Sequence, residues 1–390
     1  MTEGRRRHTR ALIDLDAVRH NASLLSRLVA PAALCAVVKA DAYGHGAPAV
    51  AMAAIEGGAT SLAVALVDEG IELREAGVTA PILVLSEPAA DAVADTVAAG
   101  LTPTVYTEEM RGLVEKAARA GAVRQGVQVK VDTGMHRVGA TPATVGPLAR
   151  AVVDSSALHL EAVWTHFPVA DGASDEDRAF TAGQIALFDQ VVRELAGAGV
   201  EPAMRHAANS AGAIAWPASR YDLVRCGLAL YGELPTPWVA DAFSAATGGE
   251  ELRQVLSLRS EVVAVRSLPA GARPSYGRGR ALPGPATVAT VPIGYADGVP
   301  FGLFEAGAEV LVGGRRYPLA GRVTMDQLVI DCGADSPVRP GDAVVLLGAQ
   351  GAERVTATEW ARLLGTISYE VLSRIGARVP RVVSGALGAP

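Results

Sequence analysis

A rhythm of strand followed by helix, repeated eight times, constrains the fold of this chain more than any other feature of its sequence. Between residues 35 and 231, short runs rich in β-branched residues are each followed by a loop and an alanine-rich amphipathic stretch. Strands that alternate with helices form parallel sheets, and eight such units fit a (β/α)8 TIM-type barrel. The expected strands lie at residues 36–38, 61–65, 82–85, 103–106, 127–131, 160–164, 204–207 and 223–226.

The helices of this barrel are expected at residues 67–76, 108–120 and 179–197, among others. Asp68, Thr107 and Ser174 are candidates for capping or nearly capping their N-termini. A doubly wound sheet is the alternative architecture, but it would need a glycine fingerprint directly after the first strand. The pair Gly44 and Gly46 is too short for that fingerprint, so the barrel is favoured.

A second, mainly β domain is expected after about residue 245, where the helical periodicity fades. Alternating short strands are expected there at residues 256–265, 286–291, 309–312, 328–331 and 343–347. Gly313 and Gly314 are a two-residue hairpin signal between two of these runs. The sequence thus predicts an α/β barrel over residues 11–240, a linker around 235–249 and a β domain over 246–390, which the N-terminal residues are candidates to join.

Composition excludes several classes of protein. The 390 residues carry a net charge of −6, whereas a nucleic-acid-binding domain normally has a basic patch. There is no secretory signal pattern and no apolar run of about 20 residues that would span a membrane. Cys35, Cys226 and Cys332 lack metal-ligand spacing and lie in apolar surroundings. We therefore expect a cytoplasmic protein with reduced thiols, no metal, no nucleic acid and no membrane partner.

The most informative local segment is Cys35-Ala-Val-Val-Lys39-Ala-Asp41-Ala-Tyr43-Gly44-His45-Gly46. A lysine stands at the end of a buried strand, where the catalytic face of a barrel lies. Burial lowers the pKa of a lysine and makes its neutral amine available as a base or a nucleophile. A surface lysine at a strand end is the competing interpretation of Lys39.

This segment closely resembles the cofactor-lysine signature of the alanine racemases, a fold type III family that uses pyridoxal 5′-phosphate (PLP). The resemblance implies that Lys39 binds PLP covalently and that Tyr43 hydrogen-bonds the cofactor phosphate. It extends from about residue 11 to Arg381, with motifs from both domains in the family's order.

The ends of the fifth and sixth strands carry two further motifs of that family. Residues 130–139 resemble its Lys-x-Asp-Thr-Gly-Met-x-Arg-x-Gly pattern, which implies that Arg137 contacts both the cofactor and the substrate carboxylate. Lys130 then positions Arg137 and is a candidate for carbamylation, with an ordinary salt-bridge lysine as the alternative. His166 follows the sixth strand, and the resemblance makes it the link between an arginine and a catalytic tyrosine.

The seventh and eighth strands resemble the phosphate-binding part of the family. Asn209 and Ser210 open a helix, where free N–H groups favour an anion, although a serine N-cap is a common structural alternative. Gly227 and Leu228 are implied to donate backbone N–H groups to the phosphate. Arg225 is implied to face the pyridine nitrogen, and a permanently charged arginine disfavours a proton there.

The β domain supplies the remaining site residues that the resemblance implies. Tyr276 is the second catalytic base opposite Lys39, and in the family this tyrosine comes from the other subunit of a homodimer. Met325 binds the substrate carboxylate through its backbone N–H, Tyr295 lies near the substrate entrance, and Tyr369 touches the phosphate.

The sequence therefore predicts a homodimeric PLP-dependent alanine racemase that supplies D-alanine for peptidoglycan. A broader-specificity or serine racemase stays open, because Phe301 departs from the family's usual arginine near the entrance. A racemase-like protein that binds PLP and an inhibitor is a further alternative. A PLP-dependent decarboxylase would usually have an acidic residue in place of Arg225. A PLP-carrying homeostasis protein would lack the β domain and hence Tyr276.

Overall fold

The computed structural model describes residues 7–385, which form two compact units. One unit comprises Ala17–Ala42 and Ala47–Arg253. Of the described residues, the other comprises 7–16, 43–46 and 254–385. The described part of the chain contains no helix that is both long enough and apolar enough to cross a membrane.

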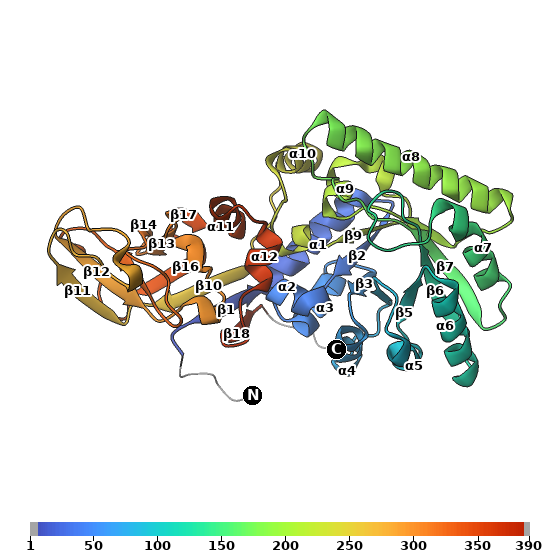
Figure 1. Cartoon of the computed structure of the whole chain (residues 1–390), viewed down its shortest axis with the longest axis horizontal. Helices are drawn as coiled ribbons and strands as arrows, with labels where there is room; N and C mark the ends of the chain where they lie inside the picture. The colour runs from blue at the N-terminus through green and yellow to red at the C-terminus, as the bar shows by residue number, and fades with distance from the viewer. Residues whose placement is uncertain (1–6, 386–390) are drawn as a thin grey trace. The chain divides into compact units, whose positions relative to one another are not determined.

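The first unit is built on an eight-stranded parallel sheet that curls into a barrel. Its order is β8-β7-β6-β5-β4-β3-β2-β9, and the backbone bonds Asp222 N–H to Arg205 O and Arg225 N–H to Ala208 O join the two end strands. This confirms the predicted barrel (Figure 1). The strands are β2 (Ala33–Val37), β3 (Ser61–Val64), β4 (Ile82–Val84), β5 (Thr102–Val105), β6 (Gln125–Lys130), β7 (Leu158–Trp164), β8 (Met204–His206) and β9 (Leu223–Cys226).

Helices follow the barrel strands in alternation. They are α1 (Leu15–Val29), α2 (Lys39–Gly44), α3 (Ala47–Glu56), α4 (Val67–Glu75), α5 (Val93–Ala98), α6 (Glu108–Ala120), α7 (Pro142–Val153), α8 (Asp175–Gly197), α9 (Ser210–Ala215) and α10 (Pro237–Thr247). Thr107 and Ser174 cap α6 and α8 as expected, each accepting a backbone N–H. At α4 the cap position is Leu66, and Glu69 accepts the N–H groups of Ala65 and Leu66, so Asp68 lies in the first turn.

The expected linker at residues 235–249 contains a helix. Pro237 occupies the first turn of α10, where its missing N–H costs nothing, and Gly248 ends the helix with a φ of 67°. Pro237 and Gly248 thus mark the two ends of a helix within the expected linker.

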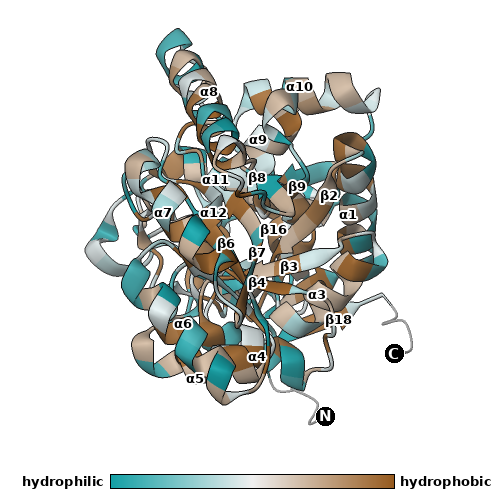
Figure 2. Cartoon of the chain, turned by 90° about the vertical axis from the view of Figure 1, so that its right-hand side faces the viewer, coloured by the Kyte–Doolittle hydropathy of each residue, from teal (hydrophilic) through white to brown (hydrophobic). Residues whose placement is uncertain are grey.

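The barrel core is made by the strands themselves. Every residue of β4, β5, β6 and β9 is buried, as expected for a parallel sheet covered on both faces. In Figure 2 the strands around β4, β6 and β7 are brown, whereas α6 and α8 carry teal residues. The ends of these strands therefore present side chains from a rigid framework.

The second unit is mainly β, as predicted. One sheet has the order β14-β13-β16-β10-β1-β18, with β17 paired to β16, and the other has the order β11-β12-β15. The strands are β1 (Arg10–Asp14), β10 (Leu256–Glu261), β11 (Ala264–Leu268), β12 (Ala286–Val291), β13 (Glu309–Val312), β14 (Arg315–Pro318), β15 (Leu328–Asp331), β16 (Ala343–Gln350), β17 (Glu353–Val355) and β18 (Arg381–Ser384).

One feature of this unit differs from the expectation, and two others complete it. The run 256–265 is divided between β10 and β11, which belong to different sheets. The N-terminal strand β1 pairs with β10, which accounts for the N-terminal residues in this unit. Two helices, α11 (Ala357–Leu364) and α12 (Ser368–Ser373), follow the last of the expected strands. The hairpin at Gly313 and Gly314 is confirmed, with φ of 58° and 76°.

Candidate active site

Lys39 begins a left-handed turn at the end of β2. Four consecutive non-glycine residues, from Ala40 to Tyr43, have φ between 51° and 56°. Each left-handed residue with a Cβ costs about 1–2 kcal/mol, so the surrounding structure must hold the turn in place. Glu69 accepts the N–H of Ala40 at 2.6 Å, and Asp41 accepts the N–H of Ala47 at 2.7 Å. These bonds fix the backbone that carries the lysine.

The environment of Lys39 favours a neutral amine. The side chain is half-buried, and burial is the largest cause that lowers its pKa. The nearby guanidinium of Arg137 lowers it further, and the carboxylate of Glu69 opposes this effect. The alternative of an ordinary surface lysine is therefore not supported by its surroundings.

Arg225 projects from β9 and is almost completely buried. Its guanidinium donates to Nδ1 of His206 at 2.6 Å and to Nδ1 of His166 at 3.0 Å. It also donates to the carbonyl groups of Thr165 at 2.9 Å and Ala207 at 3.0 Å, and its Cζ lies 4.6 Å from the centre of the Trp164 ring. These contacts fix both the charge and the orientation of Arg225.

The two histidines beside Arg225 are neutral. Burial lowers the pKa of each far below its ordinary value, and the positive charge of Arg225 lowers both further. Because Nδ1 of His206 accepts from Arg225, its Nε2 carries the hydrogen that is donated to Gln128 Oε1 at 2.9 Å. His166 and His206 therefore add no positive charge to this end of the barrel.

Lys130 lies at the end of β6 and is 3% exposed. Its Nζ lies 4.5 Å from the centre of the Trp164 ring, and no carboxylate within residues 7–385 forms an ion pair with it. Burial, Arg225 and Arg137 lower its pKa to about 7, and Asp132 partly opposes them. The salt-bridge interpretation of Lys130 therefore finds no partner in the described residues.

The starts of two short helices meet through Ser210. Asn209 is the N-cap of α9 and accepts the N–H of Gly212 at 3.0 Å, so Ser210 is not the cap. The hydroxyl of Ser210 instead accepts the N–H groups of Gly227 at 3.1 Å and Ala229 at 3.4 Å. Gly227 precedes the helical turn Leu228–Tyr231, and the expected phosphate-binding residues of the barrel are thus neighbours.

The other unit carries the remaining predicted residues. The rings of Tyr43 and Tyr369 lie 5.9 Å apart. Tyr295 packs edge-on against Phe301 with the ring centres 6.3 Å apart. Met325 is 53% exposed and Tyr276 is 77% exposed. The predicted site residues therefore form two groups, one at the ends of the barrel strands and one in the β unit.

Sequence reasoning missed two residues that shape the barrel group. Trp164 lies under both Lys130 and Arg225, and Glu69 bonds to the turn after Lys39. Trp164 is the last residue of an expected strand, so its place at the catalytic end could have been inferred. Nothing local in the sequence marks the bond from Ala40 to Glu69, because Ala40 lies in an earlier βα loop.

The barrel group has the composition of an anion site with a reactive amine. Arg137 and Arg225 contribute positive charge, Arg137 lowers the pKa of Lys39, and both arginines lower the pKa of Lys130. An anionic ligand would relieve this repulsion, and Lys39 offers an amine to a carbonyl group. The donor set thus fits a cofactor that carries both a phosphate and an aldehyde.

Comparison with known proteins decides the family. The sequence model of the alanine racemase N-terminal domain matches residues 13–235, and that of the C-terminal domain matches residues 255–383. The chain belongs to the alanine racemase family. This is a family of PLP-dependent isomerases, in agreement with the donor set around Lys39.

Alanine racemases from several bacteria are similar over nearly the whole chain. The alanine racemase of Symbiobacterium thermophilum is 43% identical over 97% of this chain and 98% of the relative. That of Carboxydothermus hydrogenoformans is 40% identical over 95% and 98%. The crystal structure of the alanine racemase from D-cycloserine-producing Streptomyces lavendulae has a TM-score of 0.88 at 37% identity, covering 97% of this chain and 98% of that one.

Proposed function

We propose that this protein interconverts L-alanine and D-alanine with PLP as its cofactor. The observation that carries the proposal is the barrel group, in which a half-buried Lys39 with a lowered pKa lies among the cations Lys130, Arg137 and Arg225. Family membership gives the reaction class, and the arrangement in this chain supports it. We further propose that the enzyme acts in the cytoplasm and supplies D-alanine for peptidoglycan.

The residues that would hold PLP are those that the family resemblance names. Lys39 would bind it covalently, and Arg225 would face the pyridine nitrogen. When bound, PLP acidifies the α-proton of an amino acid by withdrawing electrons from its α-carbon. The phosphate would be held by hydroxyl and N–H donors of Tyr43, Asn209, Ser210, Gly227, Leu228 and Tyr369.

The chain's own residues would hold the substrate and move the proton. Arg137 and the backbone N–H of Met325 would bind the substrate carboxylate, for which a guanidinium offers two parallel bonds. Lys39 and Tyr276 would act as acid and base on opposite sides of the α-carbon. A proton removed on one side and returned on the other inverts the configuration. Tyr295, near the entrance, would favour a small side chain.

Arg225 supports racemisation over other PLP reactions. Its guanidinium is held by four hydrogen bonds to His206, His166, Thr165 and Ala207, and none of these acceptors is a carboxylate that would neutralise it. A fixed cation at this position disfavours a proton on the ring nitrogen, because two positive charges would then lie side by side. The weaker electron withdrawal that results would limit side reactions such as transamination.

We propose that the active form is a homodimer in which Tyr276 serves the partner's Lys39. Its side chain is 77% exposed, and none of the described residues hydrogen-bonds its hydroxyl. The preceding Ser275 has a φ of 66° and donates to the carbonyl of Arg322 at 2.6 Å, which holds the turn that presents the ring. A tyrosine whose backbone is fixed but whose ring is exposed is consistent with a role in the active site of another subunit.

A broader-specificity or serine racemase is the second candidate. Tyr295, Phe301 and Arg374 line an open cavity of about 540 Å³ in the β unit, and Phe301 is 54% exposed. The cavity and the aromatic residue at a position where the family usually has arginine are reasons to test amino acids larger than alanine. A racemase-like protein that only binds PLP or an inhibitor would have no use for Tyr276.

The deciding experiment is a chiral analysis of L-alanine and, separately, L-serine incubated with the purified protein and PLP. Formation of D-alanine until the enantiomers are equal supports the proposal, and the serine reaction measures selectivity. Tyr276→Phe should stop removal of the α-proton from one enantiomer only, which deuterium incorporation from D2O would detect. Tyr221→Phe is the matched control. It removes a tyrosine hydroxyl that donates to Asp189 on α8 and has no proposed part in the reaction. No racemisation of either amino acid despite bound PLP would contradict the proposal.

A further inference from the structure

Two loops of the β unit that carry proposed substrate residues are bonded into one piece. The N–H of Tyr295 donates to Thr324 O at 2.9 Å, and the N–H of Ala296 donates to Met325 O at 3.0 Å. Gly294 lets the loops approach this closely, because a Cβ there would lie 2.2 Å from Thr324 O. Any movement of one loop therefore displaces the other.

Asp297 anchors the first of these loops from inside. It is completely buried at the end of the helical turn Tyr295–Asp297, and its Oδ2 accepts the N–H of Gly294 at 3.0 Å. Its Oδ1 forms ion pairs with Arg7 at 2.5 Å and with Arg378 at 3.4 Å. A buried carboxylate needs such compensation, so the two arginines and the loop depend on each other.

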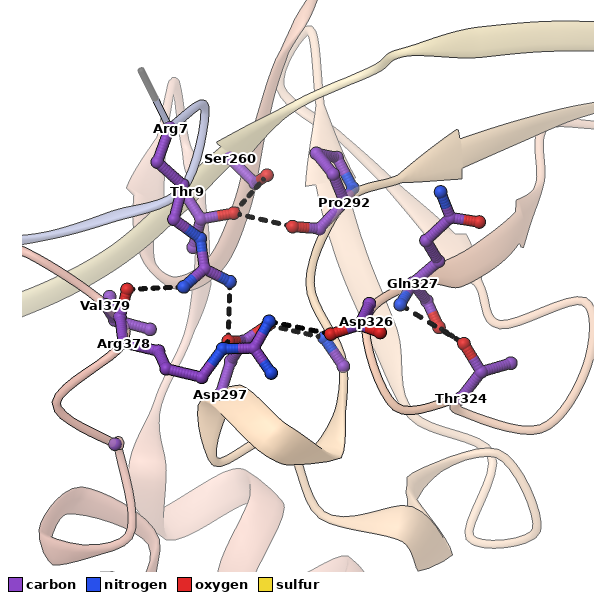
Figure 3. A network of polar contacts seen from close by, with 12 residues as sticks. Arg7, Thr9, Ser260, Pro292, Asp297, Thr324, Asp326, Gln327, Arg378 and Val379 are labelled. Atoms are coloured by element: carbon purple, nitrogen blue, oxygen red, sulfur yellow. Dashed lines mark hydrogen bonds and ion pairs between the residues drawn. The ribbon is translucent and has the colours of Figure 1, made fainter. Parts of the chain in front are cut away.

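Arg378 also holds the second loop. Its guanidinium donates to Asp326 Oδ1 at 2.7 Å, and Asp326 directly follows Met325. Figure 3 shows the Arg378 side chain between Asp297 and Asp326, with Arg7 on the far side of Asp297. A single side chain thus joins the carboxylates of both loops.

The N-terminal segment completes the arrangement. Arg7 also donates to the backbone carbonyl of Arg378. The hydroxyl of Thr9 donates to Pro292 O at 3.0 Å and lies 2.9 Å from the hydroxyl of Ser260 (Figure 3). The chain before β1 therefore braces the loop that leads to Tyr295.

We propose that Arg378 is a positioning residue for substrate binding, which places the Met325 N–H and the Tyr295 side chain through its ion pairs with Asp326 and Asp297. Arg7 is the second brace of the same arrangement. The inference rests on the proposed function, because the roles of Met325 and Tyr295 belong to it. Arg378 itself is half-exposed, so its loss leaves the core of the unit filled.

The expected effect is on substrate binding more than on turnover. An N–H that holds the carboxylate equally before and during proton transfer contributes to KM and leaves kcat largely unchanged. We expect Arg378→Gln to raise the KM for alanine about tenfold, which corresponds to a weakened carboxylate contact. Because the two enantiomers have equal energy, kcat/KM must fall equally in both directions.

Two measurements test this on the PLP-loaded protein. The first is KM and kcat for each enantiomer, below the melting transition of every variant. The second is hydrogen exchange of the amides in residues 294–298 and 324–327, which needs no activity. Arg378→Gln should speed this exchange. Arg378→Lys keeps the positive charge but lacks the guanidinium that reaches two carboxylates, so it should give intermediate values. Arg27→Gln is the matched control, because it removes an exposed ion pair with Glu250 in the barrel unit.

Each result decides the proposal. Raised KM with faster exchange in Arg378→Gln, and neither change in Arg27→Gln, supports it. A wild-type KM in Arg378→Gln overturns it, whatever the exchange shows. If the unmutated protein racemises no alanine, the proposed function fails instead, and unchanged exchange in Arg378→Gln would separately overturn the link between the loops.

Discussion

Arg225 donates a hydrogen bond to Nδ1 of His206 at 2.6 Å, and both side chains are buried. The bond keeps His206 neutral, because a proton on its Nδ1 would point at the positively charged guanidinium of Arg225. Arg225 holds Nδ1 of His166 in the same way at 3.0 Å. Arg225 is therefore a fixed cation flanked by two neutral imidazoles.

Removing the cation should raise the pKa of both histidines. In Arg225→Met, burial still lowers these pKa values, but the repulsion from Arg225 is gone, so they should rise and stay below the ordinary value. In Arg225→Lys the charge remains and the pKa values should stay low. Side-chain NMR of the histidines across a pH series measures this. Equal pKa values of His206 in Arg225→Met and the unmutated protein would contradict it.

Acid should destabilise the protein from about pH 6.5 downward. The pKa of His206 is lowered on folding, so below its unfolded pKa the unfolded chain binds the extra proton. Its stabilising contribution is complete above about pH 6.5 and is lost by up to about 1.4 kcal/mol per pH unit below it.

Urea unfolding at several pH values between 7.5 and 5.5 tests this dependence. His206→Asn should flatten the slope, even if the variant is less stable at every pH. His159→Gln, which replaces a partly exposed histidine near Glu161, is the control and should keep the slope. A slope unaffected by His206→Asn would mean that other groups cause the loss of stability.

The barrel could be predicted from sequence because its signal is repeated. Eight runs of β-branched residues, each followed by an amphipathic stretch, specify parallel strands wherever the individual boundaries fall. The β unit was harder to predict. β1 and β18 are paired through partners more than 100 residues away along the chain, and α11 and α12 are too short for a clear helical period.

The candidate site likewise has a part that the sequence predicts and a part that it does not. Lys39 and His166 follow the ends of β2 and β7, and Arg225 lies near the end of β9, so their position at one end of the barrel follows from the fold. The neutral state of His166 could not be predicted, because it depends on burial and on Arg225, a residue 59 positions away. The same holds for Asp297, whose partners Arg7 and Arg378 come from opposite ends of the chain.

Lys130 should react with carbon dioxide. With a pKa of about 7, roughly half of its amine is neutral at pH 7, and a neutral amine can form a carbamate. The negative charge formed would be stabilised by Arg137 and Arg225, which now repel the ammonium. NMR with isotope-labelled bicarbonate should show a carbamate signal at pH 8 that is lost as the pH falls below about 6.

The assignment of that signal needs two variants. Lys130→Gln should remove it, whereas Lys116→Gln, which changes an exposed lysine on α6, should retain it. A signal that survives in Lys130→Gln would place the carbamate elsewhere.

Shared active sites should be detectable by mixing two inactive variants. Lys39→Ala lacks one proposed base and Tyr276→Phe lacks the other, so each homodimer should fail to racemise alanine. A mixed dimer, however, contains one site in which the Lys39 of one subunit meets the Tyr276 of its partner. Random reassociation makes half of the dimers mixed, each with one intact site, so activity should return to about a quarter of the unmutated value.

The control for this experiment separates exchange of subunits from mere mixing. The two variants are combined either before or after a step of denaturation and refolding, and racemisation is measured by chiral chromatography. Recovery only after joint refolding supports a site completed by the partner, because mixing without exchange creates no new dimers. If Tyr276 served the Lys39 of its own chain, every subunit would still lack one base, and no recovery would occur under either condition.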